Sequence, residues 1–208
     1  MPDKKYKTIC IGIDQSYKNT GVSISADGKL LKVSSINLEK YSNNSEKRSI
    51  LQYKLKRILK KIFCKADEIV CIIERIRLRS QGFLNIDYIK SIGALNALIV
   101  DIMGLYDIPV YSVDTRCWKS QIVGSSKPGN PNNCWAMEPE KYPTFEWLKN
   151  NYPNLLMSVF IDMTGTKKKK NIFKENGKLF KINDDACDSA AISMFWFYGE
   201  SDKLTLEL

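Results

Sequence analysis

The sequence has 208 residues, 44% of them hydrophobic, which suits one globular domain of moderate size with a full core. Its 32 Lys and Arg exceed its 23 Asp and Glu, and the formal net charge of +9 favours a polyanionic partner, nucleic acid before a membrane surface. The sequence has no histidine, which excludes Ser-His-Asp triads, Cys-His dyads and most zinc sites.

Any acid–base or metal chemistry must therefore rest on carboxylates and lysines. The six cysteines form no C-x-x-C pair, which is typical of reduced thiols in a cytosolic protein. The N-terminus is not a signal peptide, and no apolar run reaches transmembrane length. We expect a cytoplasmic location, with an organelle or a viral host compartment as the alternative.

The N-terminal part begins with a β-branched run that ends in one carboxylate. The apolar run 9–13 predicts a central strand buried on both faces, with Asp14 at the point where it leaves the core. Gly21 begins a second short strand, and 26–29 supplies a turn into a third over 30–36. A carboxylate at the tip of a buried strand needs a partner, either a metal ion or an ordinary cap or turn.

A second apolar run over 68–74 repeats this pattern and ends in Glu74. Before it, 43–63 predicts an amphipathic helix whose basic side is either a solvated face or a surface near a phosphate backbone. If the two strands are parallel neighbours, Asp14 and Glu74 meet at one edge of the sheet. Three arginines then follow with a period of two, and we interpret them as a phosphate-contacting rim: Arg75, Arg77 and Arg79.

The middle of the chain predicts two helices separated by a strand. The helix over 85–105 is apolar on more than one stripe, so it forms a core helix, a homodimer surface, or both. A short strand over 109–113 follows. Asp114 then caps a helix that carries Lys119 and ends near Gly124.

Two further segments predict irregular structure. Residues 125–142 are rich in Pro, Gly and Asn and form a long loop, which is usually functional or mobile. Residues 165–181 hold seven lysines and one acid, and we expect a flexible basic loop or hairpin. The predicted organisation is one domain over 1–208 that carries an inserted loop at about 125–142 and a basic loop at about 165–181.

The last helix starts near residue 183 with three acids, more than a cap needs. Asp185 and Asp188 are three residues apart and share a face near its N-terminus, although spacing alone also permits a pair of Asp184 with Asp188. Small residues follow, which allows the helix to approach the sheet closely: Ala186, Ser189, Ala190 and Ala191.

Brought together, the four acids Asp14, Glu74, Asp185 and Asp188 would repel one another strongly unless divalent cations neutralise them. Magnesium takes oxygen ligands and keeps waters. A pair of such ions can activate a water and stabilise the leaving oxygen in phosphodiester cleavage.

The order β-β-β-α-β-α-β-α, with acids at these places, resembles the ribonuclease H-like fold, which implies an α/β protein with a mixed five-stranded sheet flanked by helices. Within this fold the chain resembles the RuvC family of Holliday junction resolvases, particularly its phage-type members, from about Lys7 to Ser193. The matching segments are the opening strand and turn 11–21, the second acidic strand 72–74, the long helix and strand 89–110, the segment 118–124 and the terminal helix 185–192.

The resemblance implies a metal-dependent, structure-specific endodeoxyribonuclease that binds branched DNA and nicks four-way junctions symmetrically as a homodimer. The helix over 85–105 would form the dimer core. Asp14, Glu74, Asp185 and Asp188 would be catalytic and would hold two Mg²⁺ ions, for which Mn²⁺ can substitute. Catalytic Lys119 would contact the region of the scissile phosphate.

The chain departs from the family pattern at two places. The family often has an aromatic residue three positions after the second acid, where this chain has Arg77, so Arg77 or Phe83 would stack near the junction centre. A second family lysine normally follows the glycine within a few residues, whereas this chain has the loop 125–142 inserted there. Either Lys127 or Lys141 would fill its role, and Lys141 has the correct place relative to the helix that follows. The predicted nucleic-acid-binding residues are Arg75, Arg77, Arg79, Lys119, Lys127, Lys141, Lys167, Lys168, Lys169 and Lys170.

Two alternatives keep the same fold. One is a broader branched-DNA or flap endonuclease, and the other is a non-catalytic, architectural DNA-binding protein, against which the presence of all four acids argues. A sugar-kinase or actin-like ATPase is disfavoured, because the second glycine after Asp14 is missing and the chain is too short for two such domains.

Overall fold

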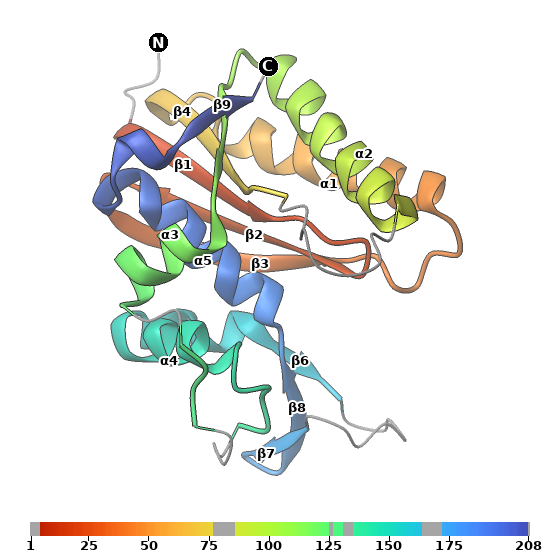
Figure 1. The fold of residues 1–208 in the computed structure, drawn as a ribbon, viewed down its shortest axis with the longest axis vertical. Helices are drawn as coiled ribbons and strands as arrows, with labels where there is room; N and C mark the ends of the chain where they lie inside the picture. Colours follow the sequence, from red (N-terminus) through yellow and green to blue (C-terminus); the bar gives the residue numbers. More distant parts are fainter. Residues whose placement is uncertain (1–4, 77–85, 125–126, 131–134, 164–171, 208) are drawn as a thin grey trace.

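A computed structural model describes residues 5–76, 86–124, 127–130, 135–163 and 172–207. Its centre is a mixed sheet of six strands in the order β3-β2-β1-β4-β5-β9 (Figure 1). The strands are β1 (Tyr6–Asp14), β2 (Asn19–Ala26), β3 (Lys29–Asn37), β4 (Ala66–Glu74), β5 (Val110–Val113) and β9 (Thr205–Glu207). The α/β class is as predicted, but the predicted number of five strands is wrong.

The sixth strand, β9, comes from the last residues of the chain and pairs antiparallel with β5. It is only three residues long and two of them are exposed, although Leu204, Leu206 and Leu208 alternate there with Thr205 and Glu207, which was the available sequence signal. It completes the sheet beyond β5, on the side opposite β3.

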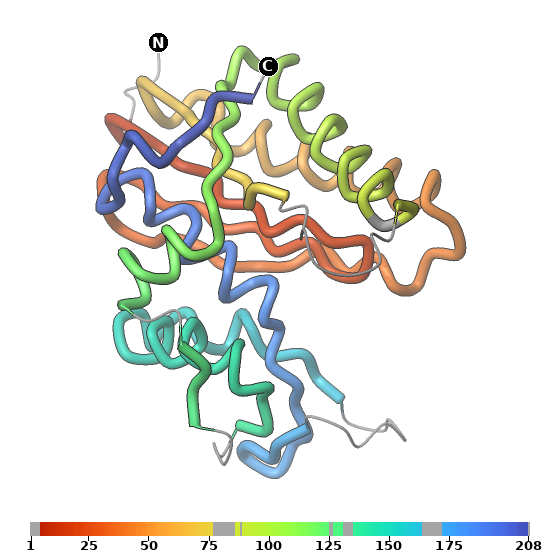
Figure 2. Tube along the Cα trace, viewed as in Figure 1, coloured from red at the N-terminus to blue at the C-terminus, as the bar shows by residue number. Residues whose placement is uncertain are grey.

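The helices cover both faces of this sheet (Figure 2). Side chains of α1 (Asn44–Ile62) and α2 (Ile86–Gly104) pack on Ile9, Ile11 and Ile13, whereas Cys10 and Ile72 point to the opposite face and pack against α5 (Asp184–Tyr198). The prediction that the first strand is buried on both faces is therefore confirmed. The helices are α1 (Asn44–Ile62), α2 (Ile86–Gly104), α3 (Thr115–Trp118) with the π-helical turn η1 (Lys119–Val123), α4 (Tyr142–Asn151), the 3₁₀ turn η2 (Pro153–Val159), α5 (Asp184–Tyr198) and the 3₁₀ turn η3 (Ser201–Lys203). None of the helices in the described ranges is long and apolar enough to cross a membrane.

A second, three-stranded sheet lies beside α4 and the start of α5 (Figure 1). Its strands are β6 (Phe160–Asp162), β7 (Phe173–Glu175) and β8 (Lys178–Ile182), in the order β6-β8-β7. The turn between β7 and β8 has positive φ at Asn176 and Gly177, as a tight hairpin requires. Part of the predicted basic loop is therefore a hairpin, while the described residues of the predicted loop 125–142 contain no strand and no helix before Tyr142.

Helix α5 lies directly on β1 and β2. A Cβ atom at Gly21 would overlap the carbonyl oxygen of Asp185, and one at Gly12 would overlap that of Ser189. Ser23 Oγ donates a hydrogen bond of 2.6 Å to the same Ser189 carbonyl. The predicted close approach of the small-residue helix to the sheet is confirmed. These contacts fix the position of α5 along β1 and β2.

Replacing Gly21 by alanine is expected to destabilise the protein by about 2–3 kcal/mol or more, because the backbone of α5 would have to move away from β2. Gly93→Ala is the matched control, since nothing in the described part of the chain lies within 4 Å of a Cβ there and alanine favours the helical state. Urea unfolding of both variants measures the difference. Equal stabilities would contradict direct packing of α5 on β2.

Candidate active site

Two of the predicted acids end neighbouring strands. Strands β1 and β4 are parallel, with Ile13 opposite Ile73, so Asp14 and Glu74 leave the sheet side by side. This confirms that the two acidic strands meet at one edge. The parallel pairing explains the arrangement, because the carboxyl ends of parallel strands lie at the same edge of a sheet.

Neighbouring groups hold Glu74 in place. Thr115 Oγ1 donates a hydrogen bond to Glu74 Oε1, and Gln15 Nε2 donates one of 2.6 Å to the main-chain oxygen of Glu74. Thr115 is the first residue of α3, whose N-cap is Asp114 as predicted. Neither residue was predicted as part of the site; the available signal was that Gln15 directly follows β1 and Thr115 comes two residues after the end of β5.

The other two acids come from the first turns of α5. The N-cap of this helix is Asn183, whose Oδ1 accepts a 3.1 Å hydrogen bond from the Ala186 amide. Asp184, considered above as a partner of Asp188, instead forms an ion pair with Lys141. Asp185 is the acid of this turn whose charge acts on Asp14.

The carboxylates act on one another electrostatically. Burial raises the pKa of Asp14 well above its usual range, and the charges of Glu74, Asp188 and Asp185 raise it further. Burial also raises the pKa of Asp185 to about 6, with the nearby Lys141 charge opposing the rise and the Asp188 charge adding to it. Such mutual repulsion between converging acids marks a site that a cation would stabilise.

Asp188 is subject to the same two influences. Burial raises its pKa to about 6, the Lys119 charge opposes this rise, and the Glu74 charge adds to it. Its Oδ1 atom is buried and has no hydrogen-bond partner, and the Thr144 hydroxyl lies close enough to this carboxyl to oppose the rise in its pKa. A buried carboxylate oxygen without a donor is costly, so this atom is available to a ligand.

The lysines separate into those near the acids and those away from them. Lys119 begins the π-helical turn after buried Trp118, and its charge opposes the rise in the pKa of Asp188. Such π-helical turns occur often at functional sites. The charge of Lys141 opposes the rise in the pKa of Asp14, Asp185 and Asp188, whereas Lys127 is exposed in the loop. Of the two candidates for the second lysine, the geometry favours Lys141.

Two lysines near the acids were not predicted. The charges of Lys181 and Lys18 oppose the rise in the pKa of Asp185. Lys18 lies in the turn between β1 and β2, four residues after Asp14, which is a usable sequence signal. Lys181 lies in β8 within the basic segment, and nothing in the sequence separates it from the other lysines there.

The remaining predicted DNA-binding residues are less informative. The Arg75 guanidinium donates hydrogen bonds to Ser112, at 3.3 Å, and to Thr205, so it is anchored to β5 and β9. A role for Arg75 in binding DNA stays a prediction. Outside the described residues lie Phe83, Arg77, Arg79, Lys167, Lys168, Lys169 and Lys170.

The donor set fits a hard divalent cation in its chemistry. All four side chains offer carboxylate oxygens, which Mg²⁺ and Mn²⁺ prefer, and one of these oxygens is buried without a partner. Within the described ranges, no group of three or more Cys, Asp or Glu side chains is arranged so that it could hold a metal ion as it stands. The side chains would therefore have to adjust their rotamers to ligate one.

The mixed sheet, the helices on both faces and the acids at the carboxyl edge define a ribonuclease H-like fold. No family model and no curated protein matches the sequence. Among solved structures, the chain is similar to RuvC of Thermus thermophilus in complex with a Holliday junction substrate, with a TM-score of 0.55 at 12% identity over 89% of this chain and 90% of that one.

A second structure of Thermus thermophilus RuvC gives a TM-score of 0.54 at 12% identity, over 96% of this chain and 99% of that one. The yeast mitochondrial Holliday junction resolvase Ydc2 gives 0.52 at 15% identity, over 94% of this chain and 80% of that one. The resemblance to the RuvC family is thus confirmed at the level of the fold, over nearly the whole chain.

Proposed function

We propose that this protein is a RuvC-family resolvase, a metal-dependent endonuclease that nicks four-way DNA junctions. The observation that carries the proposal is the convergence of Asp14, Glu74, Asp185 and Asp188 at one edge of a fold shared with Holliday junction resolvases. The net charge of +9 supports a nucleic-acid substrate.

In this proposal the four acids hold two Mg²⁺ ions, and Mn²⁺ can replace them. When bound, such ions lower the pKa of a water and stabilise the leaving oxygen of a phosphodiester. Thr115 orients the Glu74 carboxylate, and Gln15 holds the main chain at Glu74. Lys119 and Lys141 place positive charge beside the acids, where they would contact the phosphates that flank the cleaved bond.

Symmetric cleavage of a four-way junction requires two active sites, so we propose a homodimer in which α2 forms the core. One face of α2, which includes Leu95, Ile99 and Ile102, packs into the core of its own protomer. Ile86 is exposed, and Leu98 and Val100 are only partly covered, so apolar surface remains for a second copy.

The broader branched-DNA endonuclease is the second candidate, because the same acids would cleave a flap or a fork. The architectural reading is disfavoured, since the acids destabilise one another and a protein that only binds DNA has no use for repulsive charges beside the phosphates.

A panel of equal-sized substrates tests the proposal: a four-way junction, a Y-fork, a flap and plain duplex, each with Mg²⁺, Mn²⁺ or chelator. We expect paired nicks in the junction with either ion and none with chelator, because the sequence has no histidine to do metal-free acid–base work. Faster cleavage of forks or flaps would favour the broader endonuclease. Undiminished cleavage in chelator would contradict the metal-dependent mechanism.

A further inference from the structure

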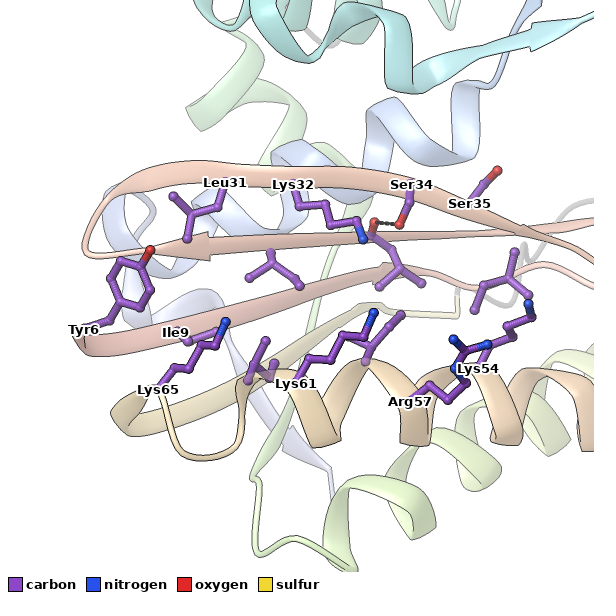
Figure 3. A pocket seen from close by; sticks show the side chains of 15 residues that line it. Tyr6, Ile9, Leu31, Lys32, Ser34, Ser35, Lys54, Arg57, Lys61 and Lys65 are labelled. Carbon is purple, nitrogen blue, oxygen red and sulfur yellow. Dashed lines mark hydrogen bonds between the residues drawn. The ribbon is translucent and has the colours of Figure 1, made fainter. Parts of the chain in front are cut away.

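A groove of about 450 Å³ lies on the α1 side of the sheet, between this helix and the edge strand β3 (Figure 3). None of the four acids of the candidate active site lines it. Its volume is in the range of pockets that bind ligands. The proposed nuclease activity makes no use of this groove.

The floor of the groove is apolar. Ile9 and Val22 lie at the bottom, each only 1% exposed, while Ile24 and Ile58 are partly covered. Leu31 on β3 is 39% exposed beside them. The apolar surface that stays exposed here, on Leu31 above all, is unfavourable in water when the groove is empty, so it favours a partner that brings apolar side chains.

The rim of the groove is cationic. Lys54, Arg57 and Lys61 project from α1, Lys65 follows this helix, and Lys32 faces them from β3 (Figure 3). Among the described residues that line the groove, none is an Asp or a Glu.

These charges have few partners within the protein. In the described part of the chain, the four rim lysines form no ion pair with a carboxylate, and the Arg57 guanidinium lies 5.7 Å from the ring centre of Tyr53. The rim is therefore free to pair with an external anion, and its position around an apolar floor limits what that anion can be.

We propose that this groove binds an acidic amphipathic segment of another protein, with its apolar residues on the floor and its Asp and Glu residues against the rim. The α1 cations are spaced by three and four residues, so they follow one side of about two helical turns, which matches a short helical segment laid alongside. This site is independent of the proposed cleavage chemistry.

Two other occupants fit less well. A DNA duplex would satisfy the cations, but its phosphate-lined surface offers few apolar groups to fill the floor. Tyr6 is the only aromatic residue among the described residues that line the groove, which leaves little for unpaired bases to stack on. A second copy bound groove to groove would bring two sets of cations together, which is repulsive.

The probe is a fluorescein-labelled helical peptide of about 14 residues, with leucines on one face and glutamates on the other. Its affinity for the full chain is measured by anisotropy at about 150 mM salt, beside a scrambled peptide of the same composition. Lys61→Glu is compared with Lys60→Glu, because both lysines are exposed in the last turn of α1 but only Lys61 lines the groove. Leu31→Glu tests the floor at a position where an added charge leaves the core intact.

We expect saturable binding of the patterned peptide, a loss of about tenfold or more for Lys61→Glu and for Leu31→Glu, and a loss of less than about threefold for Lys60→Glu. Equal losses for the two lysine variants, equal binding of the scrambled peptide, or no saturable binding would overturn the proposal. A larger loss of junction-DNA binding for Lys61→Glu than for Lys60→Glu would also overturn it and assign the groove to DNA. Circular dichroism confirms that each variant is folded.

Discussion

Replacing Asp14 by asparagine is expected to reduce cleavage of a four-way junction by about a thousandfold or more, while junction binding persists or tightens. The substitution keeps the shape of the side chain and removes one charge from a site where Glu74, Asp185 and Asp188 all act on this carboxylate. A metal site depends on that charge, whereas binding gains from the loss of a negative group beside the phosphates. Single-turnover cleavage and a binding titration measure the two effects separately.

Glu74→Gln is expected to behave in the same way, since the amide can still accept the hydrogen bond from Thr115 but carries no charge. Glu39→Gln is the matched control, because Glu39 is exposed after β3 and its loss changes the net charge equally. If the Glu39 and Glu74 variants cleave alike, the cluster is not the catalytic centre.

The acid substitutions also have an expected signature in stability. The folded-state pKa values of Asp185 and Asp188 are raised from 3.8 to about 6, so the folded protein binds more protons than the unfolded chain between these values. These groups therefore cost stability as pH rises through that window, and the cost is complete at pH 7. Asp188→Asn removes it and should stabilise the metal-free protein at pH 7 by on the order of 1 kcal/mol, with little gain at pH 4.

Asp185→Asn and Asp184→Asn are expected to differ by more than about a hundredfold in cleavage, although the two residues are adjacent. The charge of Asp185 raises the pKa of Asp14, and the charge of Asp188 raises the pKa of Asp185, so Asp185 belongs to the cluster of acids. Asp184 forms an ion pair with Lys141 that is partly exposed, and such pairs contribute little. Asp185→Asn should therefore lose about a thousandfold in cleavage and Asp184→Asn less than about tenfold.

The opposite order, with Asp184→Asn inactive and Asp185→Asn active, would mean that the acids of α5 act one residue earlier than the geometry indicates. If neither substitution affects cleavage while binding is intact, the carboxylate cluster is not the active site. The architectural reading would then be the better one. Because Asn183 is the N-cap, neither substitution removes the cap of α5, and both variants should fold.

The sequence by itself determined the parts of the site that depend on local patterns. A continuous β-branched run that ends in an acid predicts a buried strand with its carboxylate at the edge, and both β1 and β4 are of this kind. Parallel pairing then brings Asp14 to Glu74. The small residues that start α5 likewise indicated close packing, since only small side chains let a helix backbone lie on a sheet.

Only the tertiary structure decided which neighbours complete the site. Asp184 and Asp185 differ by one residue, which is about 100° around a helix, and Asn183 as the N-cap sets which of them turns toward β1. Lys141 lies at the end of a long loop, where chain position alone does not determine spatial position, and packing of α4 against α5 brings it to the acids. The basic groove arises in the same way: α1 shows a charged stripe in sequence, but the apolar floor comes from β1, β2 and the edge strand β3, which only the fold brings beside this helix.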